Sequence, residues 1–340
     1  MTYRIALNFE DGVTRFIECG EGESVLDAAY RHKINLPMDC SDGVCGTCKC
    51  RCESGSYDLG ADFLEEALTA DEAGDRLVLT CQMRVKSDCV ISVPVPSSAS
   101  KVKPVEHWAT VRAVDRVSES ALVLRIAPDD ARALDFLPGQ YVNLFVPGTT
   151  EHRAYSFSSK PGAAEASFLI RNVPGGRMSR WLAGGPRAGE RMRMIGPQGS
   201  FFLREVERPV LMLAGGTGLA PLLSMLEVLA DRGTDQPIRL LYGVTADVDL
   251  VETTRIAAIA ARLPTLTYTF CVVDPGSACP RKGYVTDHLG DEDLHGGDCD
   301  IYLCGPPVMV ESVRRFLHDK ALVPARFLYE KFVATEAVPA

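Results

Sequence analysis

The chain has 340 residues, enough for two or three domains that each bury a core. Hydrophobic residues make up 46% and charged residues 24% of the sequence, which is ordinary for a globular protein and excludes collagen, coiled coils and bulk disorder. The formal net charge of -9 argues against a nucleic-acid partner. Because no apolar run approaches the roughly 18 residues of a membrane helix and no basic segment leads into an apolar one at the start, we expect no membrane span, no signal peptide and a cytoplasmic protein.

The first segment, residues 1–97, is predicted to open with a β-hairpin, because two alternating runs flank the turn Glu10-Asp11-Gly12. Ser24, with Asp27 three residues later, predicts the capped start of a short helix. The expected strands are 3–9, 14–17, 77–79 and 90–93. Residues 98–104 end a stretch rich in proline and serine, and we interpret them as an interdomain linker.

The second segment, residues 105–205, contains short strand-like runs separated by Pro-Gly and Gly-Gly turns, which is typical of a small antiparallel barrel. Its expected strands are 109–117, 122–126, 141–145, 155–158 and 167–171. From residue 206 to 340, strands of the fully buried type alternate with helices, which predicts a parallel α/β sheet. There the expected strands are 210–213, 238–244, 266–272 and 301–304, and the expected helices are 219–231, 255–263 and 308–320.

Acidic residues and cysteines are concentrated near the N-terminus. Residues 1–100 contain 9 Lys and Arg against 17 Asp and Glu, so most of the net negative charge belongs to this part of the chain. Eight of the twelve cysteines lie within the first 89 residues. A cytosolic chain more often uses such a group of cysteines to bind metal than to form disulfides.

Four of these cysteines have the spacing of a plant-type 2Fe-2S site. Cys40, Cys45 and Cys48 form C-x4-C-x2-C, and Cys81 follows at a distance that allows it to close the fourth position. The alternative is a structural zinc site, but zinc sites usually pair two C-x2-C motifs and only one is present. The remaining cysteines are interpreted as small buried hydrophobic residues: Cys50, Cys52, Cys19, Cys89, Cys271, Cys279 and Cys299.

Two motifs of the second segment could together bind a flavin dinucleotide. In the run 153–158, Arg153 could meet a diphosphate and Tyr155 could pack on a flat ring. The Gly-Gly turn at 175–176 leads into a helix whose N-terminal N–H groups could bind the same diphosphate. Either motif alone also fits a plain strand or a plain glycine turn, so the prediction rests on their combination.

Two turns of the third segment could bind a nicotinamide dinucleotide. The run 214–221 (AGGTGLAP) follows a predicted strand and precedes a predicted helix, the setting in which a glycine-rich turn binds phosphate. The run 304–307 (CGPP) ends the last core strand of the predicted sheet. Ligands of open parallel sheets bind at these strand ends, so we expect the two turns to flank one crevice.

Taken together, these residues make the chain similar to members of the ferredoxin-NADP reductase superfamily in which a plant-type ferredoxin precedes the flavin and nicotinamide domains. Within that class it resembles the reductase components of benzoate, toluate and anthranilate 1,2-dioxygenases, through the motifs above and the terminal YEKF at 329–332. The resemblance implies a β-grasp ferredoxin domain at 1–97, an antiparallel β-barrel FAD domain at 105–205 and a parallel α/β NADH domain at 206–340.

The resemblance also implies roles for individual residues. The residues expected to bind FAD are Arg153, Tyr155, Ser156, Gly175, Gly176, Met178, Ser179 and Phe332, and those expected to bind NADH are Gly216, Thr217, Gly218, Cys304 and Gly305. Ser156, Glu330 and Cys304 would shape hydride transfer, without any residue acting as a general base. The implied reaction takes electrons from NADH to FAD, to the 2Fe-2S cluster and on to a terminal oxygenase.

Three other readings remain open at the level of sequence. The same electron-transfer chain could serve a methane, phenol or toluene monooxygenase. A regulatory or electron-bifurcating subunit would relay electrons without binding NADH, which the two nicotinamide turns argue against. A zinc-binding scaffold would be colourless. For the preferred reading we expect a monomer that forms a transient complex with its oxygenase and binds neither nucleic acid nor membrane.

Overall fold

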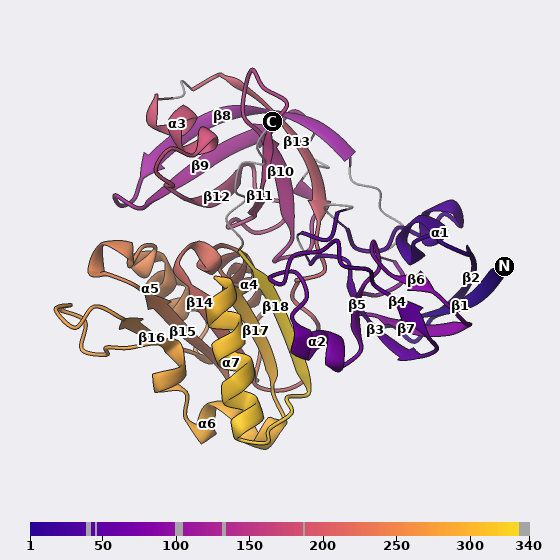
Figure 1. The fold of residues 1–340 in the computed structure, drawn as a ribbon. Coiled ribbons are helices and arrows are strands. Elements are labelled where there is room, and N and C mark those ends of the chain that lie inside the picture. The colour runs from indigo at the N-terminus through magenta and orange to yellow at the C-terminus, as the bar shows by residue number, and fades with distance from the viewer. Residues whose placement is uncertain (39–41, 45, 99–104, 131–133, 186–187, 333–340) are drawn as a thin grey trace. The chain divides into compact units, whose positions relative to one another are not determined.

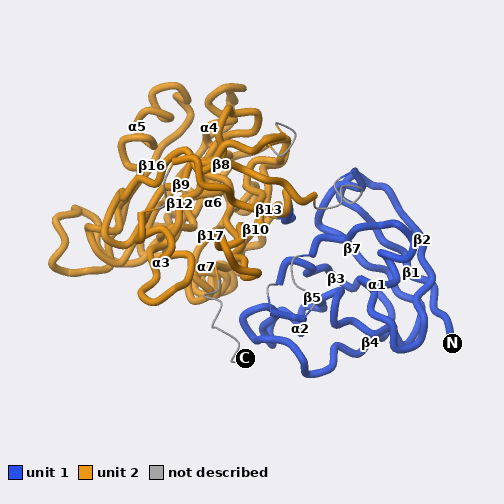
Figure 2. Tube along the Cα trace, turned by 90° about the horizontal axis from the view of Figure 1, so that it is seen from above, with its two compact units in different colours: residues 1–104, 198–200 blue, residues 105–197, 201–340 orange. Residues whose placement is uncertain are grey.

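The computed structural model describes residues 1–38, 42–44, 46–98, 105–130, 134–185 and 188–332. The chain divides into two compact units, one of residues 1–104 with 198–200 and one of residues 105–197 with 201–340 (Figure 2). The first unit contains the predicted ferredoxin domain. The second contains both the predicted flavin domain and the predicted nicotinamide domain.

The first unit is built on a five-stranded sheet in the order β2-β1-β7-β3-β5 (Figure 1). Strands β1 and β2 form the predicted antiparallel hairpin, β7 runs parallel to β1, and β3 pairs antiparallel with both β7 and β5. The predicted Ser24 cap is confirmed, since its Oγ accepts a hydrogen bond from the Asp27 backbone N–H at 3.0 Å. The elements are β1 Thr2–Phe9, β2 Thr14–Gly20, α1 Val25–Arg31, β3 Lys49–Ser54, β4 Tyr57–Asp58, α2 Ala70–Gly74, β5 Leu77–Leu79, β6 Arg84–Val85 and β7 Cys89–Val93.

In the second unit, the predicted antiparallel barrel is confirmed as a six-stranded sheet in the order β11-β10-β13-β8-β9-β12 (Figure 1). The Ser158 backbone N–H donates to the Ser167 carbonyl at 2.8 Å, so the sheet nearly closes beside β11 and β12. The barrel core includes Phe157, Phe168 and Leu124, all fully buried. The elements are β8 Val105–Arg116, β9 Ala121–Pro128, β10 Tyr141–Phe145, β11 His152–Ser156, β12 Ala166–Arg171, α3 Arg177–Ala183 and β13 Arg191–Gln198.

The predicted parallel α/β sheet is also confirmed, with five strands in the order β16-β15-β14-β17-β18 (Figure 1). Its apolar strands are buried on both faces, as expected where helices cover a parallel sheet. The strands are β14 Val210–Gly215, β15 Ile238–Val244, β16 Leu266–Val272, β17 Asp300–Gly305 and β18 Arg326–Lys331. The helices are η3 Gly216–Gly218, α4 Leu219–Arg232, η4 Asp247–Asp249, α5 Thr253–Arg262, η5 Val285–His288, α6 Asp291–Leu294, η6 His295–Gly297 and α7 Pro307–Asp319.

Five strands were missed by the sequence-based prediction, namely β3, β4, β6, β13 and β18. Strand β13 lies between β10 and β8 in the barrel, and β18 forms the outer edge of the parallel sheet beside β17. The run 329–332 therefore begins inside a strand, which places the terminal motif beside the carboxyl end of β17.

Candidate electron-transfer site

Two of the four predicted cluster ligands are described, and the fold brings them together. Cys48 directly precedes β3 and Cys81 lies just beyond β5, and both side chains are buried. Their Sγ atoms lie 3.3 Å apart. The other two predicted ligands, Cys40 and Cys45, lie outside the described residues. A buried, all-sulfur pair of this kind fits an iron-sulfur cluster, whose irons bind cysteine thiolates.

The described part of the predicted cluster loop packs tightly against the chain around residues 62–67. Gly43 has φ +76°, and a Cβ there would lie 2.6 Å from Phe63 Cβ. Gly46 has φ +74°, and its Cβ would lie 3.1 Å from the Ala67 carbonyl oxygen. Both positions need glycine, because the backbone is left-handed and the neighbouring chain leaves little room for a side chain. Cys50, interpreted as a buried hydrophobic residue, is indeed buried, and its desolvation raises the pKa of the thiol to about 12.

The predicted flavin residues lie on β11 and at the start of α3. Tyr155 packs against the barrel core, and burial raises the pKa of its phenol. Ser179 Oγ accepts a hydrogen bond from the Val173 N–H at 2.8 Å, which holds the turn that contains Gly175, itself at φ +77°. The Met178 side chain packs into the barrel core, so its backbone, not its side chain, faces the turn that would meet a diphosphate.

The three residues predicted to shape hydride transfer meet in the second unit, although they come from β11, β17 and β18. Ser156 Oγ donates a hydrogen bond to Glu330 Oε2 at 3.2 Å. Cys304 is paired with Glu330 across β17 and β18, and its Sγ lies 4.0 Å from the same carboxylate oxygen. Burial, and secondarily the charge of Glu330, hold the pKa of Cys304 well above its usual value. Cys304 is therefore a neutral thiol at physiological pH.

The two predicted nicotinamide turns touch at the carboxyl edge of the parallel sheet. A Cβ on Gly218 would lie 2.3 Å from the Cys304 carbonyl oxygen, and one on Gly305 would lie 2.8 Å from Met309 Sδ. Gly216, in contrast, has φ +54° and nothing within 4 Å of a Cβ. The glycines at 218 and 305 thus allow close approach of the turns, whereas Gly216 supplies an unusual backbone angle beside open space. The Phe332 N–H donates to the Gly305 carbonyl at 2.9 Å, which ties the terminal motif to the same edge.

Two contacts near this site were not found from sequence. Arg255 of α5 donates to the Ser158 carbonyl at 2.6 Å and pairs with Glu227 of α4 at 3.1 Å, so it links the end of the barrel strand to two helices of the parallel sheet. Lys331, next to Glu330, is nearly buried and pairs with Glu311 of α7 at 2.9 Å. Arg255 belongs to no motif singled out in the sequence, and the motif at 329–332 that contains Lys331 does not indicate its partner, so only the fold reveals these contacts.

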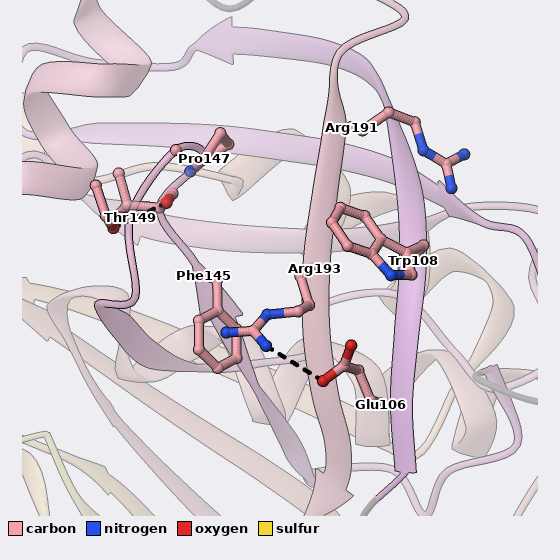
Figure 3. A pocket seen from close by; sticks show the side chains of 9 residues that line it. Glu106, Trp108, Phe145, Pro147, Thr149, Arg191 and Arg193 are labelled. Carbon is pink, nitrogen blue, oxygen red and sulfur yellow. Dashed lines mark hydrogen bonds and ion pairs between the residues drawn. The ribbon is translucent and has the colours of Figure 1, made fainter.

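A cavity of about 350 Å³ lies on the flavin barrel, among β8, β13 and the turn between β10 and β11 (Figure 3). Arg193 lies over the Phe145 ring, 3.6 Å from its centroid, and pairs with Glu106 at 3.3 Å. Arg191, on the same strand, pairs with Asp129. Both guanidinium groups therefore have carboxylate partners, and the cavity contains none of the predicted site residues. It is a separate feature from the predicted cofactor sites.

Among the helices that the structure describes, none is both long and apolar enough to cross a membrane.

Three parts of the chain match known domain families. Residues 8–86 match the 2Fe-2S iron-sulfur cluster binding domain, residues 109–203 the oxidoreductase FAD-binding domain, and residues 212–315 the oxidoreductase NAD-binding domain. These matches confirm the predicted order of domains and the three predicted cofactors.

Relatives are similar over nearly the full length. The toluate 1,2-dioxygenase electron transfer component of Pseudomonas putida is 52% identical over 98% of this chain and 100% of its own length. The 2-halobenzoate 1,2-dioxygenase electron transfer component of Burkholderia cepacia is 50% identical over 98% of this chain and 99% of its own. A solved cytochrome P450 reductase of Amycolatopsis has a TM-score of 0.70 at 31% identity, covering 98% of this chain and 100% of its own. The chain therefore belongs to the family of electron transfer components of aromatic-ring dioxygenases, which are oxidoreductases with 2Fe-2S, FAD-binding and NAD-binding domains.

Proposed function

We propose that this chain passes electrons from NADH, through FAD and the 2Fe-2S cluster, to the terminal oxygenase of a dioxygenase that acts on an aromatic carboxylate. The relatives named for toluate and 2-halobenzoate dioxygenases support this class of acceptor. The structural observation that carries the proposal is the 3.2 Å hydrogen bond from Ser156 to Glu330, which joins the flavin motif to the nicotinamide edge of the parallel sheet. When bound, FAD supplies the step from hydride transfer to single-electron transfer.

In this proposal the residues of the chain bind FAD and NADH and orient them for electron transfer. Arg153 and the turn before α3 hold the FAD diphosphate, and the turn at 216–218 holds that of NADH. Ser156 Oγ keeps its proton directed at Glu330 Oε2, which fixes the orientation of both groups. The neutral, buried thiol of Cys304 contributes bulk without adding charge at the strand end.

The proposal also covers the partner protein, the oligomeric state, the location and the domain boundaries. We infer a transient complex with the oxygenase, a monomer in solution, a cytoplasmic location, and domains at 1–97, 105–205 and 206–340. None of the ten cysteines in the described part of the chain forms a disulfide, which suits a reducing compartment. Small, polar interfaces suit an electron carrier that must bind and leave quickly.

The deciding experiment mixes the purified holoprotein with NADH and with purified terminal oxygenases, one for an aromatic carboxylate and one from a multicomponent monooxygenase. We expect rapid reduction of the first and slow reduction of the second, while ferricyanide reduction proceeds with neither present. Preferential reduction of the monooxygenase would overturn the proposed acceptor and leave the electron-transfer chain itself intact.

We expect NADH to be preferred to NADPH by roughly tenfold to a hundredfold in kcat/KM, which corresponds to about 1 to 3 kcal/mol. The tip of β15 leads to Asp247 and Asp249, where an NADPH enzyme usually places an arginine for the 2'-phosphate. Asp247 accepts hydrogen bonds from Ser277 and from the Ala278 N–H, and these lower its pKa, so it stays ionised near neutral pH. Steady-state kinetics with both cofactors test this, and equal kcat/KM values would contradict it.

We expect the oxygenase-coupled rate, at saturating NADH and limiting oxygenase, to fall as ionic strength rises. The exposed carboxylates of Asp42, Asp62, Glu65 and Glu66 are close in sequence to the predicted cluster loop or to the segment packed on it. Added salt weakens steering between exposed charges, because the Debye length is only about 8 Å at 0.15 M.

Ferricyanide reduction, which needs no docking, is the control and should fall less. A coupled rate that stays flat or rises with salt would point instead to apolar docking beside the same loop. Val44 and Leu64, 38% and 45% exposed, are the apolar side chains available there.

A further inference from the structure

Two thiols outside the predicted ligand set lie together in the sheet of the first unit. Cys52 is on β3 and Cys89 is on the neighbouring β7. Cys52 is opposite Ile91, so Cys89, two residues before Ile91, is on the same face of the sheet. The two thiols interact, since each shifts the pKa of the other. The sequence-based interpretation of both as isolated buried residues therefore missed a pair.

Arg76 binds this pair on one side. Its Nη2 donates to Cys52 Sγ at 3.4 Å and to the Gly55 carbonyl at 2.8 Å, and its Nε donates to the Cys52 carbonyl at 2.7 Å. The interaction with Cys89, aided by the Arg76 guanidinium, lowers the pKa of Cys52 despite burial. The same interaction raises the pKa of Cys89. The arrangement therefore favours a thiolate at Cys52 beside a protonated thiol at Cys89.

A short exposed turn covers both sulfurs. Residues 54–56 are all exposed, whereas Cys52 is 0% and Cys89 3% exposed. The carbonyl oxygens of Ser54 and Ser56 lie 3.3 Å and 3.6 Å from the Cys52 and Cys89 sulfurs. A Cβ on Gly55 would lie 2.5 Å from Cys89 Sγ, so the turn covers the pair closely. Opening of this single turn would expose both sulfurs.

We propose that Cys52 and Cys89 are an oxidisable dithiol, which a hydroperoxide converts to an intramolecular disulfide. The Cys52 thiolate attacks the O–O bond, becomes a sulfenic acid and releases an alkoxide or hydroxide, which takes a proton from water. The Cys89 sulfur then attacks the Cys52 sulfur, the S–S bond forms, and water leaves. The two electrons that the pair loses are those that reduce the peroxide.

Cys19 gives a matched comparison in the same unit. It is also fully buried, but its thiol contacts the backbone carbonyls of Gly20 and Glu23, and burial raises its pKa to about 11. Among the described residues, no arginine donates a hydrogen bond to its sulfur and no second thiol shifts its pKa. We therefore expect Cys19 to remain reduced under conditions that oxidise the Cys52 and Cys89 pair.

The test uses the loaded holoprotein, hydrogen peroxide added in steps, alkylation of the remaining thiols and tryptic mapping without reductant. Trypsin cleaves after Arg51, Arg76, Lys86 and Lys101, so Cys52 and Cys89 fall in the peptides 52–76 and 87–101, each with a single cysteine. We expect these two peptides to become linked by a disulfide while the visible absorption of the cluster persists. Dithiothreitol should separate them again. In Cys89→Ser the link should be lost and Cys52 should be trapped by a sulfenic-acid reagent, whereas Cys19→Ser should leave the link unchanged.

The proposal is overturned if both peptides remain alkylated and unlinked at peroxide doses that already bleach the cluster. It is also overturned if Cys52 links only to Cys48 or Cys81, since that would be damage following loss of the cluster. A wild-type protein is sufficient for either result, so the test does not depend on how well the variants fold.

Discussion

Replacing Cys81 by serine (C81S) is expected to remove most of the iron-sulfur cluster while sparing the flavin reactions. Cys81 and Cys48 hold their sulfurs 3.3 Å apart in a buried site, and a hydroxyl does not replace a thiolate as a ligand for such iron. Iron and sulfide content and the visible spectrum measure the loss. Cytochrome c reduction should fall more than about tenfold, because it requires single electrons from the cluster. NADH-dependent ferricyanide reduction should persist, since the residues proposed for it lie in the second unit.

Cys19→Ser is the matched control, because Cys19 is a buried free thiol of the same unit that is outside the predicted ligand set. It should keep its iron and its cytochrome c activity. If C81S lost its iron but still reduced cytochrome c at the wild-type rate, the flavin alone would deliver the electrons and the proposed order of carriers would be wrong.

The sequence predicted most of the regular elements wherever a local pattern determines them. The strand expected at 238–244 has those bounds in the structure, because a mostly apolar run suits a strand buried on both faces. The strand expected at 266–272 also has its expected bounds, although it is an edge strand with exposed residues. The capped helix after Ser24 was predictable for the same reason, since its hydrogen bonds lie within four residues of chain.

Two of the missed strands, β13 and β18, show where local pattern fails. In β13 the residues Arg191 and Arg193 alternate with Met192 and Met194. A sequence with such long charged side chains is easily interpreted as a loop when the neighbouring strands of the barrel are unknown. Every residue of β18 is partly exposed, because it is the edge strand of its sheet, so no alternation of apolar and polar residues marks it. Both strands are stabilised by pairing with neighbouring strands that are distant in sequence.

The motifs predicted which residues could form the site, but not how they meet. Ser156 and Glu330 are 174 residues apart, and the Arg255 contact to Ser158 spans 97. Such contacts depend on how the barrel and the parallel sheet of the second unit pack, which no window of sequence contains. The pair of Cys52 and Cys89 is a similar case, since the register of β3 against β7 brings the two sulfurs together.

Replacing Gly218 by alanine (G218A) is expected to lower kcat/KM for NADH about a hundredfold, the effect that a displacement of about 1 Å can have on a reacting pair. The added Cβ would lie 2.3 Å from the Cys304 carbonyl oxygen and 2.9 Å from the Gly305 N, both backbone atoms that cannot rotate away. The φ of Gly218 is -60°, which suits any residue, so the effect is purely steric. The turn at 216–218 must therefore move away from the tip of β17. Stopped-flow reduction of the flavin by NADH measures this.

Gly233→Ala is the matched control, because Gly233 ends the same helix, α4, and a Cβ there has nothing within 4 Å. Its φ of +74° makes alanine strained by about 1 to 2 kcal/mol, so we expect a lower melting temperature with kcat/KM unchanged. G218A should keep its FAD, since the atoms that the added Cβ would meet belong to Cys304 and Gly305, not to Arg153 or the turn before α3, which are proposed to hold the FAD diphosphate. If G218A reduced its flavin at the wild-type rate, contact between the two turns would not position NADH. If it lost FAD instead, the altered turn would act on the flavin barrel, and the assignment of 216–218 to the nicotinamide site would need revision.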